Sequence, residues 1–229
     1  MTRVLPHVAI DGPAASGKTT VGRSVARRLG FLYLDTGAMY RALAHLALRN
    51  EIDLDNQHAL LRLLEQYPVR VELDAESASG YRVFAGEREL GPELTSSEVT
   101  AAVSIVAAHP LVREKMVEQQ RTIASRGPVV MAGRDIGSVV LPDAPFKVYL
   151  TASLPARVER RRAELQAKGI DVDVHRLAQE LAERDALDQT RPTSPLRVAP
   201  GAVEIDSSSL SADDVTDEIV RRVKSAATA

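Results

Sequence analysis

Residues 12–19 constrain the fold of this chain more than any other feature of its sequence. They read GPAASGKT and satisfy the pattern G-x-x-x-x-G-K-[ST], which forms a phosphate-binding loop only between a strand and a helix. Residues 8–10 are a short apolar run with a β-branched residue at each end, which predicts a buried strand. Apolar residues then recur at a spacing of four from Val21 to Leu29 and predict a helix that ends at Gly30. The motif therefore lies in the context that its chemistry requires.

Each part of this loop suits the binding of a nucleotide phosphate. Its glycines let successive backbone N–H groups point inward, and the N-terminus of the following helix adds a partial positive charge. Lys18 is expected to reach the β- and γ-phosphates of ATP, and the hydroxyl of Thr19 to ligate Mg²⁺. A glycine-rich turn that binds nothing is the alternative, and the flanking strand and helix argue against it. The ATP-binding residues predicted here are Gly12, Pro13, Ala14, Ala15, Ser16, Gly17, Lys18, Thr19 and Thr20.

The rest of the chain predicts an α/β fold. A second strand at residues 31–34 and a second helix at residues 39–50 complete a βαβ unit, which implies a parallel sheet covered by helices. Further strands are expected at residues 129–131, 147–151 and 203–205, and further helices at residues 99–108, 111–125, 155–168, 175–190 and 212–223. Apolar and polar residues alternate over residues 69–73 and 81–85, with turns at Gly80 and Gly86, so a small antiparallel sheet is inserted into this core.

Composition narrows the choice of partners and compartment. The formal net charge is −2, and no terminal arm is strongly basic, so neither a nucleic acid nor an anionic membrane surface is an expected partner. No run of about 18 apolar residues is present, and residues 1–10 lack the long apolar stretch of a signal peptide. The chain has no cysteine, which fits a reducing compartment and excludes disulfides. We expect a cytoplasmic protein, and a monomer.

A phosphate-binding loop does not by itself separate a kinase from a GTPase switch or a motor. Guanine-specific GTPases need an N/T-K-x-D segment and a D-x-x-G segment after a strand, and neither is present. The identity of the phosphate acceptor must therefore come from other segments.

Four segments resemble those of the bacterial cytidylate kinases. Residues 34–41 read LDTGAMYR, directly after the second predicted strand, and are similar to the family's acceptor-site segment. Residues 133–137 (GRDIG), followed by VVLPDA at residues 139–144, resemble its motif after the third core strand. Arg184 to Arg191 resembles its arginine-rich acceptor helix, and IDGP at residues 10–13 opens its phosphate-binding loop. The resemblance covers nearly the whole chain, including the antiparallel insertion.

The resemblance implies a fold and an activity. The fold is the three-layer α/β fold of P-loop NTPases with a five-stranded parallel sheet, a helical lid at residues 153–170 and a CMP-binding insertion at residues 63–98. The core domain then comprises residues 1–62, 99–152 and 171–229. The activity is transfer of the γ-phosphoryl group of ATP to CMP or dCMP with Mg²⁺, within pyrimidine nucleotide salvage and metabolism.

The resemblance also implies roles for individual residues. The residues that correspond to acceptor-phosphate contacts are Thr36, Arg41, Arg134, Arg184 and Arg191; those that correspond to cytosine contacts are Ser104, Arg113 and Asp135; and Asp188 corresponds to the ribose contact. General chemistry agrees. The phosphate of CMP and the phosphates of ATP are both anionic and repel each other when they meet, so cations are needed between them, and guanidinium groups match phosphate geometry. Lys18 and the arginines at 134, 184 and 191 are the expected catalytic residues, and no general base is needed.

Several of these charges would also suit a simpler role on the protein surface. Arg184 and Asp188 stand four apart on a predicted helix and could be a solvated surface pair. Arg157, Arg160 and Arg161 share a basic helical face, which is either simply exposed or closes over the phosphates of ATP, with Arg157 and Arg161 as the preferred ATP contacts. The sequence leaves both interpretations of that face open.

One position departs from the family pattern. The family reads D-G-R-D where this chain has Ala132 in place of the first aspartate, and many P-loop enzymes keep there the carboxylate that orients Mg²⁺ through water. Asp35 or Asp11 could replace it.

Two other functions also remain: a kinase for UMP and CMP or for another small acceptor, and a non-catalytic nucleotide sensor. The Asp135 motif and the insertion argue against the first, and the retained acceptor arginines against the second.

Overall fold

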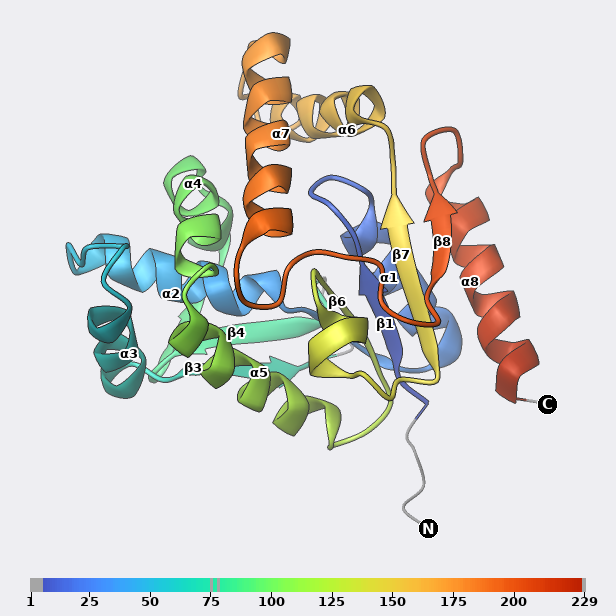
Figure 1. Ribbon diagram of the computed structural model, residues 1–229, viewed down its shortest axis with the longest axis horizontal. Coiled ribbons are helices and arrows are strands. Elements are labelled where there is room, and N and C mark those ends of the chain that lie inside the picture. Colours follow the sequence, from blue (N-terminus) through green and yellow to red (C-terminus); the bar gives the residue numbers. More distant parts are fainter. Residues whose placement is uncertain (1–5, 75, 78, 228–229) are drawn as a thin grey trace.

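A computed structural model describes residues 6–74, 76–77 and 79–227 of the chain. Within these residues a five-stranded parallel sheet stands at the centre, and a separate three-stranded antiparallel sheet lies beside it (Figure 1). The predicted α/β class, the five parallel strands and the antiparallel insertion are all confirmed. The first five and last two residues of the predicted core domain lie outside the described residues.

The strands of the central sheet follow the order β2-β6-β1-β7-β8, and every neighbouring pair is parallel. Their bounds are β1 Val8–Asp11, β2 Leu32–Asp35, β6 Val129–Gly133, β7 Phe146–Thr151 and β8 Val203–Asp206. Both faces of β1 and β6 are buried over their whole length. A strand covered on both faces has no solvent side, and for that reason these two segments are apolar runs without alternation.

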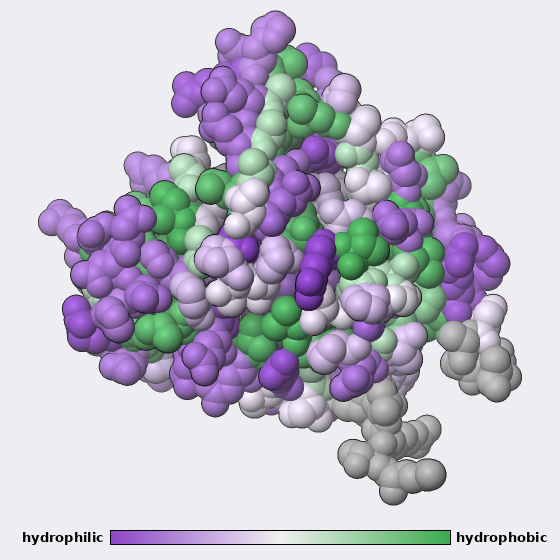
Figure 2. Space-filling view, in the orientation of Figure 1, coloured by the Kyte–Doolittle hydropathy of each residue, from purple (hydrophilic) through white to green (hydrophobic). Residues whose placement is uncertain are grey.

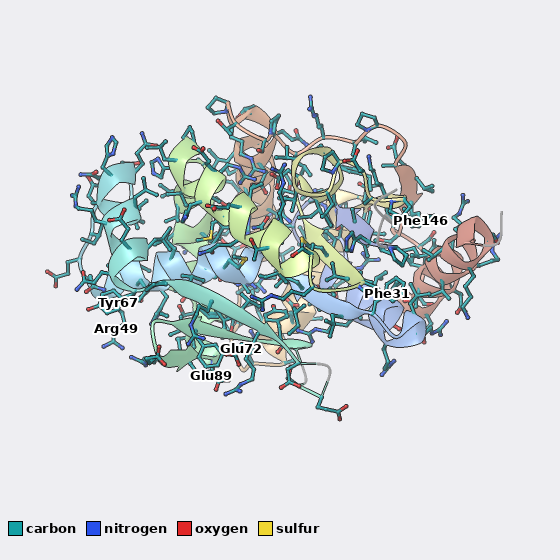
Figure 3. All side chains as sticks on the ribbon, turned by 90° about the horizontal axis from the view of Figure 1, so that it is seen from below. Phe31, Arg49, Tyr67, Glu72, Glu89 and Phe146 are labelled. Carbon is teal, nitrogen blue, oxygen red and sulfur yellow. The ribbon has the colours of Figure 1, made fainter. Side chains whose placement is uncertain are left out.

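The antiparallel sheet consists of β3 Val69–Leu73, β4 Tyr81–Ala85 and β5 Arg88–Leu90, in that spatial order. The third strand, β5, is too short to show a periodicity, and the sequence did not predict it. The outer surface of this sheet is charged: Glu72 and Glu89 point away from the core, and both lie within ion-pair distance of Arg82 (Figure 3). Its other face packs on α2. The alternation in the sequence is therefore the alternation between these two faces.

The helices have the following bounds: α1 Lys18–Leu29, α2 Gly37–Arg49, α3 Gln57–Gln66, α4 Ser97–Val106, α5 Pro110–Ala124, α6 Leu154–Gln166, α7 Val174–Thr190 and α8 Ala212–Ala227, with a 3₁₀ helix η1 at Pro92–Thr95 and a π-helix η2 at Ile136–Val140. α1 packs against β6 and α8, whereas α6 and α7 pack on each other beyond the carboxyl end of β7 (Figure 1). The side chains of Ser153 and Asp173 accept hydrogen bonds from the first turns of α6 and α7 and fix where these helices begin. Hydrophilic residues cover the outer end of this helix pair (Figure 2).

Besides the short η1, two helical elements were not expected. The first is α3, which buries Leu60, Leu63 and Leu64 and is capped by the side chain of Asn56. Its leucines stand three and four apart, so a signal was present in the sequence. The second is η2, whose five residues are held by a tertiary contact: both carboxylate oxygens of Asp11 accept backbone N–H groups, from Ile136 and Gly137, at 2.8 Å each. No local pattern indicates such a contact.

No helix in the described part of the chain combines the length and apolar character needed to span a bilayer.

Candidate active site

A cleft with a volume of 1220 Å³ opens beyond the carboxyl ends of the parallel strands. The segments that follow β1, β2, β6 and β8 contribute to its lining, which is where open parallel sheets place their ligands. α6 and α7 supply further residues, and so do the antiparallel insertion, α4 and α5. Of the residues predicted from the sequence, those that line the cleft are Ala14, Ala15, Ser16, Gly17, Lys18, Thr19, Thr20, Asp35, Thr36, Arg41, Ser104, Arg113, Arg134, Asp135, Arg161, Arg184, Asp188 and Arg191. Gly12, Pro13, Asp11 and Arg157 do not.

The loop between β1 and α1 has the geometry of an anion cradle. Gly12 has φ +150°, and a Cβ added there would lie 2.0 Å from the carbonyl oxygen of Leu150 in β7, so only glycine fits. Ala15 and Gly17 have φ of 57° and 95°, in the left-handed region. Alternation between left-handed and right-handed residues turns successive N–H groups toward one point, which is how backbone nests bind anions. For Ala15 this conformation is costly, and such strain concentrates at ligand-binding loops.

The ammonium group of Lys18 is hydrogen-bonded to other residues of the same loop. Its Nζ donates to the carbonyl oxygen of Pro13 at 2.5 Å and to Oγ of Ser16 at 3.3 Å. Burial lowers the pKa of Lys18 well below its ordinary value, and the positive charge of Arg134 lowers it further. A phosphate anion at this point would counter both effects on the pKa of Lys18, because its negative charge would stabilise the ammonium group, which the fold leaves poorly neutralised.

Asp188 on α7 joins two of the predicted acceptor arginines. Its Oδ2 accepts a hydrogen bond from Nε of Arg134 at 2.6 Å, and its Oδ1 lies 3.6 Å from Arg191. Although burial alone would raise the pKa of Asp188, Arg134 and Arg191 hold it below its ordinary value. Asp188 is only 6% exposed. The alternative that Asp188 and Arg184 form a solvated surface pair is therefore wrong: Asp188 is buried, and its hydrogen-bond partner is Arg134, which follows β6.

Arg184 stands among the other cleft cations without a carboxylate within ion-pair distance in the described chain. Burial lowers its pKa to about 10, and the charge of Arg134 is the next largest cause. Arg41 and Arg161 contribute in the same direction. Several guanidinium groups thus converge where the chain supplies too few anions to neutralise them. Such a group of cations is an anion-binding arrangement.

Arg113 and Asp135 form a buried ion pair at the inner end of the cleft. The two side chains contact each other directly, and the residues are 2% and 4% exposed. Arg113 also donates to the carbonyl oxygen of Ala107 at 3.1 Å and lies over the ring of Tyr40 at 5.4 Å. Arg191 reaches the other oxygen of Asp135 at 3.9 Å. Two of the three residues expected to contact cytosine, Arg113 and Asp135, are therefore already held in place by each other.

The start of α2 carries two further predicted contacts. Thr36 donates its hydroxyl to the carbonyl oxygen of Ala132 at 3.0 Å, and Arg41 forms an ion pair with Asp35 at 3.1 Å. Asp35 also accepts the N–H of Gly37 at 3.0 Å. Although burial opposes it, Arg41 holds the pKa of Asp35 below its ordinary value, so this carboxylate is charged.

The two lid arginines predicted to contact ATP have different surroundings. Arg161 lines the cleft and pairs with Glu164 at 2.6 Å on the exposed side of α6. Arg157 is buried and turned away from the cleft, because its guanidinium is engaged by Asp185 at 2.6 Å and by a backbone carbonyl of the phosphate-binding loop. The expectation that Arg157 lies on a face open to ATP is therefore corrected. Arg160, which shares the predicted basic face but was not one of its two preferred ATP contacts, does line the cleft.

The residues present fit a Mg²⁺ ion that is held mainly by phosphates and water. No group of three or more metal-binding side chains exists among the described residues, and Mg²⁺ in kinase sites needs only one or two protein ligands. Asp11 is a poor candidate, since both its oxygens accept backbone N–H groups of η2. Both oxygens of Asp35 have partners too, in Arg41 and the N–H of Gly37, but Asp35 lines the cleft whereas Asp11 does not, and it is therefore the better candidate. Asp35 also pairs in register with Ala132, so the two side chains leave the sheet on the same face. Its carboxylate thus stands next to the position where the family has an aspartate.

Several cleft residues were missed in the sequence. Ser207 follows β8 at the same edge of the sheet as the other loops, and that placement is a usable signal. Tyr81 enters from the antiparallel insertion and Lys168 from the end of the lid segment. Neither carries a motif, so only the fold brings them to the cleft.

A phosphate-binding loop that faces an arginine-rich wall across one cleft defines a P-loop kinase. The family model for cytidylate kinase matches residues 8–225. A cytidylate kinase of Pelotomaculum thermopropionicum is 50% identical over 218 residues, which are 95% of this chain and 96% of that protein. One from Geobacillus sp. (strain WCH70) is 47% identical over 217 residues, with the same coverage. The chain therefore belongs to the cytidylate kinase family and is a phosphotransferase.

A solved structure of an uncharacterised protein from Eubacterium ventriosum has the same overall fold. Its TM-score is 0.51 and its identity 14%, over 97% of this chain and 99% of that one. At this identity the likeness concerns the fold alone.

Proposed function

We propose that this enzyme transfers the γ-phosphoryl group of ATP to CMP or dCMP, giving ADP and CDP or dCDP, in pyrimidine nucleotide salvage and metabolism. The observation that carries the proposal is the opposition, across one cleft, of the Lys18 loop and the cation group that contains Arg134 and Arg184. Two anions can meet there at a reduced electrostatic cost. Family membership supports the same substrates.

The chemistry we assign to these residues is positioning and charge neutralisation. The N–H groups of the phosphate-binding loop and Lys18 would hold the β- and γ-phosphates of ATP. Arg41, Arg134, Arg184 and Arg191, with the hydroxyl of Thr36, would hold the phosphate of CMP in line with them. An ionised phosphate oxygen is the nucleophile, so no side chain has to remove a proton. This accounts for a site rich in arginine and without a candidate base.

Base choice would rest on Asp135, Arg113 and Ser104. No described residue donates a hydrogen bond to Oδ1 of Asp135, and Arg191 lies 3.9 Å from it. This oxygen can therefore accept a hydrogen bond from the 4-amino group of cytosine. Arg113 fixes the plane of that carboxylate through Oδ2. Asp188, held by Arg134, would accept a ribose hydroxyl.

Mg²⁺ is part of the proposal as the usual partner of ATP. It would be ligated by the Thr19 hydroxyl and, through water, by Asp35, and when bound it would neutralise charge on the β- and γ-phosphates.

We also propose that residues 63–98 and 153–170 move toward each other when both nucleotides bind. Side chains from both segments line the cleft, and Lys168 Nζ already lies 3.5 Å from the Thr95 hydroxyl, so the two segments are close enough to close over it. Closure would exclude water from the transferring group. Small-angle scattering should show a smaller radius of gyration with CMP plus a non-hydrolysable ATP analogue than with either alone. An unchanged radius would contradict a moving lid.

A coupled assay of ADP release tests the function directly. CMP, dCMP, UMP, AMP and GMP are offered as acceptors with MgATP, and the values of kcat/KM are compared. CMP and dCMP should exceed the others by at least about ten-fold, the discrimination expected from one buried hydrogen-bond mismatch. Comparable rates with UMP would favour the broader pyrimidine kinase, and binding of ATP without turnover of any acceptor would favour a nucleotide sensor.

A further inference from the structure

One carbonyl group of the phosphate-binding loop is held from outside the cleft. NH1 of Arg157 in α6 donates to the carbonyl oxygen of Ala14 at 3.2 Å. Ala14 and Ala15 line the cleft, whereas Arg157 does not. In a trans peptide the C=O of one residue and the N–H of the next point in opposite directions. A carbonyl of Ala14 that is directed at Arg157 therefore turns the N–H of Ala15 toward the cleft.

The guanidinium of Arg157 is itself fixed by two further partners. Its Nε donates to the carbonyl oxygen of Ala152 at 3.0 Å, and its NH1 lies 2.6 Å from Oδ2 of Asp185 in α7. Arg157 is only 7% exposed. A planar guanidinium group that binds three partners in different parts of the fold can adopt only one orientation. The phosphate-binding loop, the lid helix α6 and the acceptor helix α7 thus meet at this one side chain.

The conformation of the loop gives a reason for such a support. Ala15 adopts φ 57°, which a residue with a Cβ avoids, so the loop does not favour this peptide orientation by itself. An external hydrogen bond to the preceding carbonyl is the kind of contact that keeps a strained peptide in place.

We propose that Arg157 and Asp185 are positioning residues that orient the Ala14–Ala15 peptide, so that the N–H of Ala15 is directed at a phosphate of ATP. The proposal rests on the proposed function, in which this loop binds ATP. The alternative is that Arg157 itself contacts ATP, as the basic face of the lid helix suggested. A substitution of Asp185 distinguishes the two roles, because Asp185 holds Arg157 away from the cleft.

Calorimetric titration of ATP, without CMP, into Asp185→Asn and Arg157→Lys tests the proposal. Each variant should bind ATP about ten-fold more weakly than the parent enzyme, the cost of roughly one misdirected hydrogen bond to a charged group. The double variant should bind no more weakly than the weaker single one, because both act through one peptide. Arg162→Lys on α6 and Glu183→Gln on α7 are the matched controls. Glu183 is exposed, Arg162 is partly exposed and pairs with Glu159, and neither lines the cleft, so both variants should leave ATP affinity unchanged. CMP binding to Arg157→Lys should stay within about two-fold of the parent, which a general loss of structure would not allow.

The results that would overturn the proposal are distinct. If Arg157 instead contacted ATP directly, Asp185→Asn would release Arg157, and the variant would bind ATP as tightly as the parent enzyme or more tightly. That change in ATP affinity is opposite to the one expected here. Parent-like affinity in both variants would also reject it. Should Arg157→Lys not fold, the sign of the change in Asp185→Asn decides alone. If the parent enzyme itself does not bind ATP, the proposed function fails as well, and the two failures are thereby distinguished.

Discussion

Lys18 is the side chain on which the donor half of the site depends at the scale of single residues. Burial and neighbouring cations lower its pKa, and in the free protein its ammonium group turns back to the carbonyl oxygen of Pro13. An ammonium held this way is available to a phosphate that enters the loop, because the phosphate offers a stronger acceptor.

Lys18→Ala should lower kcat by at least about 100-fold, because the lysine neutralises charge that grows on the transferring group. The coupled ADP assay measures this, with Lys115→Ala as a control, since Lys115 is exposed and pairs with Glu118 on α5. Activity within a few-fold of the parent enzyme would contradict the assignment of the loop.

Asp135→Asn should narrow the ratio of kcat/KM for CMP over UMP by about ten- to a hundred-fold, because an amide can donate to the carbonyl oxygen of uracil where a carboxylate cannot. The structure adds a second expectation. Arg113 would lose its buried partner, at a cost of about 3–5 kcal/mol in the free energy of unfolding. Steady-state kinetics at a temperature where circular dichroism shows a folded variant separate the two effects. A constant ratio in the folded enzyme would move base choice to Ser104 and Arg113.

At the scale of elements, the contact between β1 and η2 decides where the acceptor loop sits. The carboxylate of Asp11 at the end of β1 accepts two N–H groups at the start of η2, immediately after Arg134 and Asp135. An aspartate that resembles a metal ligand in the sequence therefore serves as an anchor for the loop that carries two proposed substrate contacts.

Burial raises the pKa of Asp11 to about 6 from an ordinary value of 3.8, although the two N–H groups oppose the change. Between these values the folded chain binds more protons than the unfolded chain. The contribution of Asp11 to stability is therefore complete below about pH 4 and is lost as the pH rises through about 6. Asp11→Asn does not titrate. The difference in unfolding free energy, parent minus variant, should accordingly fall by roughly 1–3 kcal/mol between pH 4 and pH 7.

Urea unfolding of both proteins at four pH values measures this difference, with the exposed Asp143→Asn as a control. A difference that is constant over this range would mean that the N–H groups of Ile136 and Gly137 outweigh burial and keep Asp11 charged in the fold.

At the scale of the whole molecule, the cleft concentrates positive charge from several elements. Arg184 on α7 faces Lys18, Arg134 and Arg41, each from a different part of the chain. In the absence of nucleotides this arrangement opposes folding, because like charges repel in a partly buried site. The enzyme thus gives up some stability for the ability to bring two anions together.

Arg184→Ala should therefore raise the melting temperature of the nucleotide-free enzyme by a few degrees, while it raises KM for CMP at least about ten-fold and leaves ATP affinity nearly unchanged. Thermal unfolding with and without CMP shows both effects, since the stabilisation by CMP should shrink. Arg176→Ala is the control, because Arg176 is exposed on the same helix and pairs with Glu180. A lower melting temperature in the absence of nucleotides would show that Arg184 stabilises the free fold.

The sequence by itself determined the class of fold and the donor loop. Residues 12–19 carry their own chemistry, and strand and helix periodicities are local, so both can be read in short windows of the chain. The βαβ unit, the individual core strands and the alternating insertion follow from such windows, whereas the single five-stranded parallel sheet and the acceptor arginines followed from resemblance. The short β5 and the tertiary anchor of η2 have no local signal.

Only the tertiary structure decided which charges meet. Arg157 and Arg161 stand one helical turn apart on α6, yet Arg157 is drawn inward by Asp185 and by the carbonyl oxygen of Ala14, 143 residues away, whereas Arg161 lines the cleft. Asp188 likewise pairs with Arg134, 54 residues earlier in the chain, and not with its helical neighbour Arg184. The partner of a long charged side chain depends on distances between elements, and those distances are set by the packing of the whole core, not by spacing along the chain.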